Sequence, residues 1–145
     1  MADTLPSVTI VRRIKASPAK VWAAITRPEQ MIQWWGPDAG PTLRADVDVR
    51  PGGRFSVVFR LLNGEEHNPT GIYREVIPEQ KLVFTWDLPG AREPESLVTF
   101  LLKPIDGGTE LTLLHEHLPD EAERQSHELG WSGLLDKLPL FLGVA

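Results

Sequence analysis

The chain has 145 residues, of which 41% are hydrophobic and 24% are charged, and its formal net charge is −5. This length predicts a single domain, residues 1–145, with a substantial buried core, and the acidic balance disfavours nucleic acids and anionic membranes as partners. The chain contains no cysteine, which excludes disulfides, thiol nucleophiles and thiolate metal sites. It also has neither a signal peptide pattern nor an apolar run of membrane-spanning length, so the expected location is the cytoplasm.

The first part of the chain predicts one strand followed by two short helices. Residues 8–14 are rich in β-branched side chains, which favour a strand. Ser17 and Pro18 suit the N-cap and the first turn of a helix. A second short helix is expected to begin at Pro28 and to end at Gly36.

Two adjacent tryptophans, Trp34 and Trp35, close the second predicted helix. Neighbouring side chains on a helix point about 100° apart, because a turn takes 3.6 residues. We therefore expect one of these rings to pack inward and the other to flank the following loop.

From residue 43 to residue 118, apolar and polar residues alternate with the period of a strand. Asn63-Gly64 is a strong hairpin signal, Pro69 marks an edge or bulged strand, and residues 88–94 are expected to form a loop. No strand–helix–strand crossover interrupts the series, which favours an antiparallel meander. About six strands are predicted, at residues 43–50, 54–62, 67–77, 81–88, 96–104 and 109–118.

A long helix is predicted for residues 119–142, with Asp120 as its cap and Glu123 completing a capping box. Apolar residues recur along one face, and this face should pack against the sheet. The face consists of His127, Trp131, Leu134, Leu138 and Phe141. We expect an α+β fold in which a curved antiparallel sheet of six or seven strands wraps around this helix.

A strip of small residues, Ser126, Gly130 and Gly133, also runs along the predicted helix. Glycine within a helix is unfavourable by roughly 0.5–1 kcal/mol relative to alanine, so the strip indicates that something lies close to the helix backbone. Either the sheet packs tightly on the strip, or the strip leaves room for a ligand.

Several segments spread along the chain resemble one known family. They are ASPAKVW (16–22), WWGP (34–37), PGGRF (51–55), GIYREVIP (71–78), KLVFTW (81–86), GGTELTL (107–113) and Gly130-Trp131. Together they resemble the helix-grip domains of the START-like (SRPBCC) superfamily, and most closely its AHSA-like bacterial branch, named after the C-terminal domain of activators of heat-shock protein 90 ATPase. One departure is Pro139, at which we expect the last helix to kink or to stop after Leu138.

The resemblance specifies a fold more than a function, since the superfamily includes lipid and polyketide binders, cyclases and hydrolase-like proteins. It implies three candidate functions for this chain. The first is a protein that binds a small apolar or aromatic molecule, with no catalytic activity assigned. The alternatives are a co-chaperone-like interaction domain with a chaperone partner, and a cyclase- or hydrolase-like enzyme that uses acid and base residues of a pocket.

The sequence gives little support to nucleophilic or metal chemistry. There is no G-x-S-x-G motif, and Ser56, Ser96, Ser126 and Ser132 have no His partner evident from the sequence. No catalytic residue, metal site or cofactor is therefore assigned. His115 and His117 are two apart on a predicted strand, so they should face the same side. They form either a pair of metal ligands or, the reading we favour, part of a half-buried face.

Acid–base chemistry would require a buried titratable group, and the candidates are Glu75, His115 and His127. The small-molecule hypothesis instead needs a cavity between the helix and the sheet, which large side chains either line or fill. The candidate ligand-binding residues are Trp34, Trp35, Phe55, Phe59, Tyr73, Trp86, Phe100, His115, His127, Trp131, Leu134 and Leu138. Exposed strand edges and the Trp34–Trp35 region also make a homodimer a candidate assembly.

Overall fold

The computed structural model describes residues 6–36, 38, 40–87 and 96–144. The loop expected at residues 88–94 lies outside these residues. The described residues contain all the other predicted elements. In chain order they are β1 (Val8–Ile14), α1 (Pro18–Thr26), α2 (Pro28–Trp34), β2 (Thr42–Val47), β3 (Arg54–Arg60), β4 (Glu66–His67), β5 (Thr70–Ile77), β6 (Lys81–Trp86), β7 (Ser96–Ile105), β8 (Gly108–Glu116) and α3 (Glu121–Leu142).

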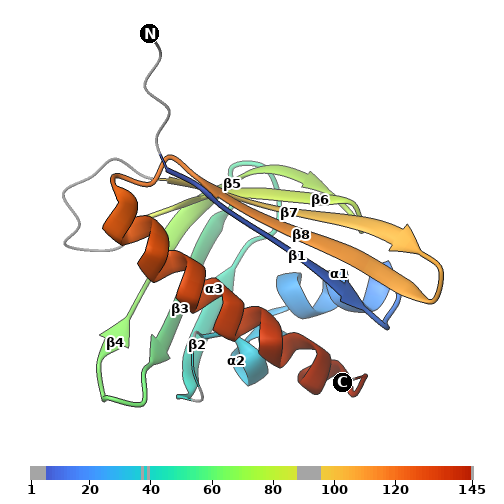
Figure 1. Cartoon of the computed structure of the whole chain (residues 1–145), viewed down its shortest axis with the longest axis horizontal. Coiled ribbons are helices and arrows are strands. Elements are labelled where there is room, and N and C mark those ends of the chain that lie inside the picture. The colour runs from blue at the N-terminus through green and yellow to red at the C-terminus, as the bar shows by residue number, and fades with distance from the viewer. Residues whose placement is uncertain (1–5, 37, 39, 88–95, 145) are drawn as a thin grey trace, which may run out of the picture.

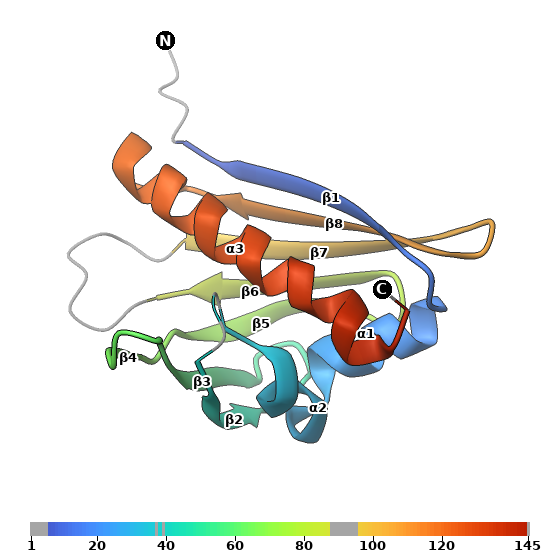
Figure 2. The same ribbon diagram turned by 60° about the horizontal axis from the view of Figure 1, so that its bottom comes forward.

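The described strands form one curved antiparallel sheet in the order β1-β8-β7-β6-β5-β3-β2, and the two-residue β4 pairs with β3 off this path. The first strand lies beside the last, with Val8 opposite His115 and Ile14 opposite Thr109. Helix α3 lies over one face of the sheet, and α1 and α2 lie near the C-terminal end of α3 (Figures 1 and 2). The predicted α+β helix-grip architecture is therefore confirmed.

The limb formed by β2, β3 and β4 turns away from the rest of the sheet (Figure 1). Pro69 separates β4 from β5, as its missing N–H predicts. The Asn68 side chain donates hydrogen bonds to the Val57 carbonyl at 2.9 Å and to the Ser56 hydroxyl at 3.0 Å, which holds the interrupted segment against β3. This break allows β4 to lie opposite the N-terminal half of α3.

The expectation that only one of the two adjacent tryptophans packs inward is wrong. Trp34 and Trp35 are 3% and 1% exposed. Helix α2 ends at Trp34, and Trp35 adopts an extended conformation with φ −64° and ψ 149°. Because Trp35 lies outside the helix, the 100° divergence between neighbouring helical side chains does not apply to this pair.

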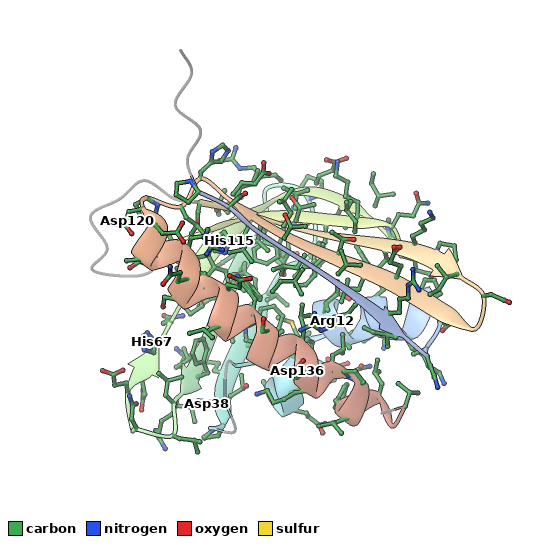
Figure 3. All side chains as sticks on the ribbon, in the orientation of Figure 1. Arg12, Asp38, His67, His115, Asp120 and Asp136 are labelled. Atoms are coloured by element: carbon green, nitrogen blue, oxygen red, sulfur yellow. The ribbon has the colours of Figure 1, made fainter. Side chains whose placement is uncertain are left out.

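Helix α3 begins where its cap predicts: the Asp120 carboxylate accepts a hydrogen bond from the Glu123 N–H at 2.8 Å. Its buried residues are Trp131, Leu134, Leu135 and Leu138. On its outer side, Asp136 pairs with Arg12 of the edge strand β1 at 3.3 Å (Figure 3). Both side chains are partly exposed, so this ion pair adds at most about 1 kcal/mol. Within the described residues, no helix is long and apolar enough to cross a membrane.

The helix does not stop at Pro139 but continues to Leu142. A proline removes one backbone hydrogen bond, and here the following residues compensate by packing. Phe141 stacks on Trp34 with ring centroids 6.5 Å apart. Gly143 then ends the helix with φ 74°, and the Val144 N–H bonds to the Pro139 carbonyl at 2.9 Å, as in a Schellman cap.

Candidate functional site

A pocket of about 570 Å³ is lined by residues of α3 and by residues of β3, β4 and the segments next to them. Three groups of residues line it: an aromatic wall, a strip of α3, and a polar rim. The wall consists of Trp35, Phe59, Trp86 and Trp131, with Leu61 and Leu134. The strip contains Ser126, Leu129 and Gly130, and the rim contains Gly36, Asp38, His67, Glu123 and His127.

The aromatic wall is held by the packing of its rings on one another. Trp131 lies 5.0 Å from Trp86 and 6.1 Å from Trp35, measured between ring centroids. Trp35 and Trp86 are both more than nine-tenths buried, yet neither indole N–H has a hydrogen-bond partner in the described chain. An unpaired buried donor is unfavourable by about 1–3 kcal/mol, so each of these two groups lowers the stability of the folded protein.

One of the two glycines within α3, Gly130, has a place in the pocket lining. Gly130 lines the pocket beside Trp131, and Ser126 lies one turn earlier on the same side. A residue without a side chain at position 130 leaves space that any larger residue would occupy. Of the two readings of the small-residue strip, room for a ligand fits Ser126 and Gly130, whereas Gly133 does not line the pocket.

One side of the rim is built on Asp38, in the connection between α2 and β2. Its carboxylate accepts hydrogen bonds from the Gly40 N–H at 2.8 Å and the Leu62 N–H at 3.1 Å, and these bonds lower the pKa of Asp38. The Lys137 ammonium group donates to the Asp38 main-chain carbonyl at 2.6 Å, and burial lowers the pKa of Lys137. These contacts fasten the connection to both α3 and the end of β3.

The other side of the rim belongs to α3. His127 Nδ1 donates to the Glu123 main-chain carbonyl at 2.8 Å, and its ring meets that of His115 edge-on at 4.9 Å. Across the pocket, His67 of β4 stacks on Phe59 at 5.7 Å. In Figure 3, His67 and Asp38 lie below α3, and His115 lies behind the first turns of α3.

Behind the pocket, a chain of buried hydrogen bonds links α3 to β7 through His115. The Trp131 indole N–H donates to His115 Nδ1 at 2.9 Å, and His115 Nε2 lies 2.6 Å from the Ser96 hydroxyl. The Ser96 hydroxyl in turn donates to the Trp86 carbonyl at 3.2 Å. His115 is completely buried, and burial, assisted by the neighbouring His127, lowers its pKa to about 3.

These contacts determine the donor and the acceptor of each hydrogen bond from Trp131 through His115 and Ser96 to Trp86. An indole nitrogen can only donate, so His115 Nδ1 is the acceptor and the proton of the neutral ring resides on Nε2. His115 therefore donates to Ser96. A general base needs a free lone pair facing the nucleophile, and His115 has none facing Ser96. The distance is that of a catalytic Ser–His dyad, but here the histidine donates the hydrogen bond to the serine, whereas in a catalytic dyad it accepts one.

Ser96→Ala gives a direct test of this assignment. The substitution leaves the buried His115 Nε2–H without its acceptor, so we expect the free energy of unfolding to fall by about 1 kcal/mol. Urea unfolding of the variant beside the unchanged protein measures the difference. Ser132→Ala on α3, outside the hydrogen-bonded chain, is the control. A variant as stable as the unchanged protein would contradict the hydrogen-bonded role of Ser96.

The sequence did not reveal this partnership, and two other expectations are corrected. His115 and His117 do not share a face, because β8 ends at Glu116 and His117 turns away with φ 66° to an exposed position. Glu75, a candidate buried acid, instead lies at the surface and pairs with Lys81 at 3.1 Å. Among the described residues, no three His, Asp or Glu side chains are grouped so that they could hold a metal ion.

The twelve candidate ligand-binding residues fall into two sets. Trp35, Phe59, Trp86, His127, Trp131 and Leu134 line the pocket. The other six are core residues that do not line it: Trp34, Phe55, Tyr73, Phe100, His115 and Leu138. Sequence reasoning missed the rim residues Asp38, His67 and Glu123, although the α3 strip with Gly130 was a usable signal for the helix side.

Comparison with known proteins identifies one matching family and a set of solved structures with a similar fold. A family model described as "Activator of Hsp90 ATPase homolog 1-like protein" matches residues 15–143. No curated protein is similar enough in sequence to count as a match.

Three solved structures illustrate the similarity. The AHSA1 protein from Silicibacter pomeroyi is 28% identical, covers 96% of this chain and 99% of its own, and has a TM-score of 0.86. Protein CV1439 from Chromobacterium violaceum is 26% identical over 96% and 97% of the two chains, with a TM-score of 0.83. CalU16 from Micromonospora echinospora is 28% identical over 97% and 81%, with a TM-score of 0.74.

Proposed function

The chain belongs to the family of Activator of Hsp90 ATPase homolog 1-like proteins, and from this premise we propose that it binds a small apolar or aromatic molecule between α3 and the curved sheet. The observation that carries the proposal is the pocket of about 570 Å³ with its wall of four aromatic rings. Ligand sites typically measure about 300–1,000 Å³ and combine an apolar lining with a few polar groups.

The layout of the pocket supports binding of a molecule with an apolar body and a polar end. The rings of Trp35, Trp86 and Trp131 line the wall. Polar side chains, among them Asp38 and Glu123, lie at the rim. Leu129, at the mouth on α3, is 77% exposed, and burying such a side chain under a ligand is favourable by about 1.5–3 kcal/mol.

Binding is better supported than catalysis by the same residues. The one buried Ser–His pair in the described chain has its proton on the wrong atom for nucleophilic attack. Glu75 is paired at the surface. His127 donates from Nδ1 to the backbone of its own helix, which leaves its Nε2 lone pair free, but no described hydrogen bond places a nucleophile at Nε2. An enzyme of the cyclase or hydrolase type would have to rely on His127 or on the rim carboxylates Asp38 and Glu123, and none of these has a nucleophilic side chain as a described hydrogen-bond partner.

Fluorescence titration with N-phenyl-1-naphthylamine, a neutral aromatic probe, tests the proposal. We expect saturable binding of one probe per chain. Leu129→Ser, at the pocket mouth, should weaken it roughly threefold or more, because part of the apolar contact is lost. Leu140→Ser is the matched control, since Leu140 is another exposed leucine on α3, 67% exposed, that does not line the pocket. Absence of saturable binding, or equal effects of the two variants, would contradict the proposal.

The family description also suggests a chaperone-related interaction. Such an interaction would use an outer surface, whereas the proposed ligand site lies between α3 and the sheet. A pull-down with purified heat-shock protein 90 separates the two functions, because a pocket substitution that abolishes probe binding should leave a surface interaction unchanged.

A further inference from the structure

The charged residues around the pocket are unevenly distributed. Two carboxylates, Asp38 and Glu123, line it from opposite sides, and no described Lys or Arg side chain does so. Two cations of neighbouring segments have other partners: the Lys137 ammonium group bonds the Asp38 carbonyl at 2.6 Å and interacts electrostatically with the Asp38 carboxylate, and Arg60 pairs with Glu66 at 3.0 Å. The charge of Asp38 is therefore partly offset by Lys137, and Glu123 is the pocket carboxylate that no described Lys or Arg pairs with.

Arg124 follows Glu123 directly in the sequence but does not neutralise it. Its guanidinium group holds Glu121 and Glu128, each at 2.8 Å, on another face of α3. Among the described residues, the ion-pair partner of the Glu123 carboxylate is His127 Nδ1 at 3.6 Å, and that nitrogen already donates to the Glu123 main-chain carbonyl. Glu123 thus retains its capacity to pair with a cation from the pocket.

The aromatic wall is an independent observation that favours the same sign of charge. Four rings, those of Trp35, Phe59, Trp86 and Trp131, line one pocket. The face of an aromatic ring carries negative electrostatic potential and attracts ammonium groups, tryptophan most strongly. Rings combined with a carboxylate are therefore suited to an organic cation.

We propose that the pocket selects ligands whose polar end is cationic, an amine or quaternary ammonium group on an aromatic or apolar body. This inference rests on the proposed binding function and specifies the ligand class of the same site. The cationic group lies between the aromatic wall and Glu123, and the apolar body occupies the rest of the pocket. Because the Glu123 side chain is 48% exposed, the charge preference is moderate, roughly tenfold between an amine and a carboxylate.

Three ligands that share one ring system test the charge preference: 2-naphthylmethylamine, 2-naphthalenemethanol and 2-naphthoate. Their dissociation constants are measured near pH 7 in low salt by displacement of N-phenyl-1-naphthylamine. We expect the amine to bind most tightly, the alcohol less tightly and the carboxylate about tenfold more weakly than the amine.

The net charge of −5 would itself favour cations, so two variants with equal net charge separate the pocket from the whole chain. Glu123→Gln removes a carboxylate that lines the pocket, and Glu128→Gln removes one from the same helix that does not line it. We expect Glu123→Gln to reduce the preference for the amine about threefold or more and Glu128→Gln to leave it unchanged.

Each remaining outcome is decisive. A carboxylate that binds as tightly as the amine would overturn the charge preference while leaving the proposed binding function intact. Equal effects of the two variants would overturn the assignment to the pocket, since net charge would then explain the preference. Failure of all three ligands and of the neutral probe to bind would overturn the binding function and the inference together.

Discussion

The free energy of unfolding is expected to fall by about 2–3 kcal/mol as the pH drops from about 7 to about 4.5, because of the single buried residue His115. In the unfolded chain this histidine titrates at its ordinary pKa of 6.5, whereas burial lowers the pKa of His115 in the folded protein to about 3. Between these two values the unfolded state binds a proton that the folded state does not. Stability is therefore fully present above pH 6.5, falls with decreasing pH, and loses no more from this residue below about pH 3.

Urea unfolding at several pH values measures this effect, with His115→Gln as the informative variant. The variant should be less stable near pH 7, because its amide cannot reproduce both bonds to Trp131 and Ser96. It should also lose about 2–3 kcal/mol less than the unchanged protein on acidification, since no imidazole remains to be protonated. His127→Gln serves as the control for a half-buried histidine. An equal acid sensitivity of His115→Gln and the unchanged protein would contradict the buried neutral state.

Gly130→Leu should reduce probe binding at least tenfold while the protein remains folded. The new side chain would occupy the pocket beside Trp131, and forcing a ligand past added carbons typically costs about 1–3 kcal/mol. Leucine is also a better helix former than glycine by roughly 0.5–1 kcal/mol, so the free energy of unfolding should stay the same or rise. Loss of binding together with unchanged or higher stability would identify Gly130 as a residue that maintains the pocket.

The control for this substitution is Gln125→Leu, which adds the same kind of side chain to an exposed position of α3 outside the pocket. Titration with N-phenyl-1-naphthylamine should give the same affinity for this variant as for the unchanged protein. A folded Gly130→Leu protein that binds the probe with unchanged affinity would show that the ligand occupies another site.

Periodicity and capping residues predicted the elements because these signals are local. Asp120 caps α3 through a bond to a residue three positions away, and Pro69 interrupts the strand in which it occurs. The resemblance to the AHSA-like branch is confirmed by the family model. Of the two outcomes predicted at Pro139, a kink or a stop, the stop was wrong: α3 continues to Leu142, and Phe141 in this last turn packs on Trp34, a tertiary contact that no local pattern reveals.

The site was less predictable because it depends on register and on connections between elements. The hairpin of β7 and β8 was expected, but its register was not. In the observed register Val98 lies opposite His115, and this brings Ser96 near the imidazole ring of His115. Asp38 and His67 come from a connection and a two-residue strand, whose positions no periodic pattern determines. The sequence could not show which aromatic residues of the inner face belong to the core and which line the pocket, since both use the same residue types.

The pairing of β1 with β8 has a consequence for how the protein is made. β1 leaves the ribosome first, yet its only partner strand in the described sheet ends at Glu116, so β1 remains unpaired until most of the chain has been synthesised. Helix α3, which covers the apolar face of the sheet, follows later still. Sheets closed by such distant contacts fold slowly, and uncovered apolar strands are prone to aggregate. The nascent chain therefore carries its aromatic face uncovered until the last helix emerges, and this is the interval in which it most depends on protection.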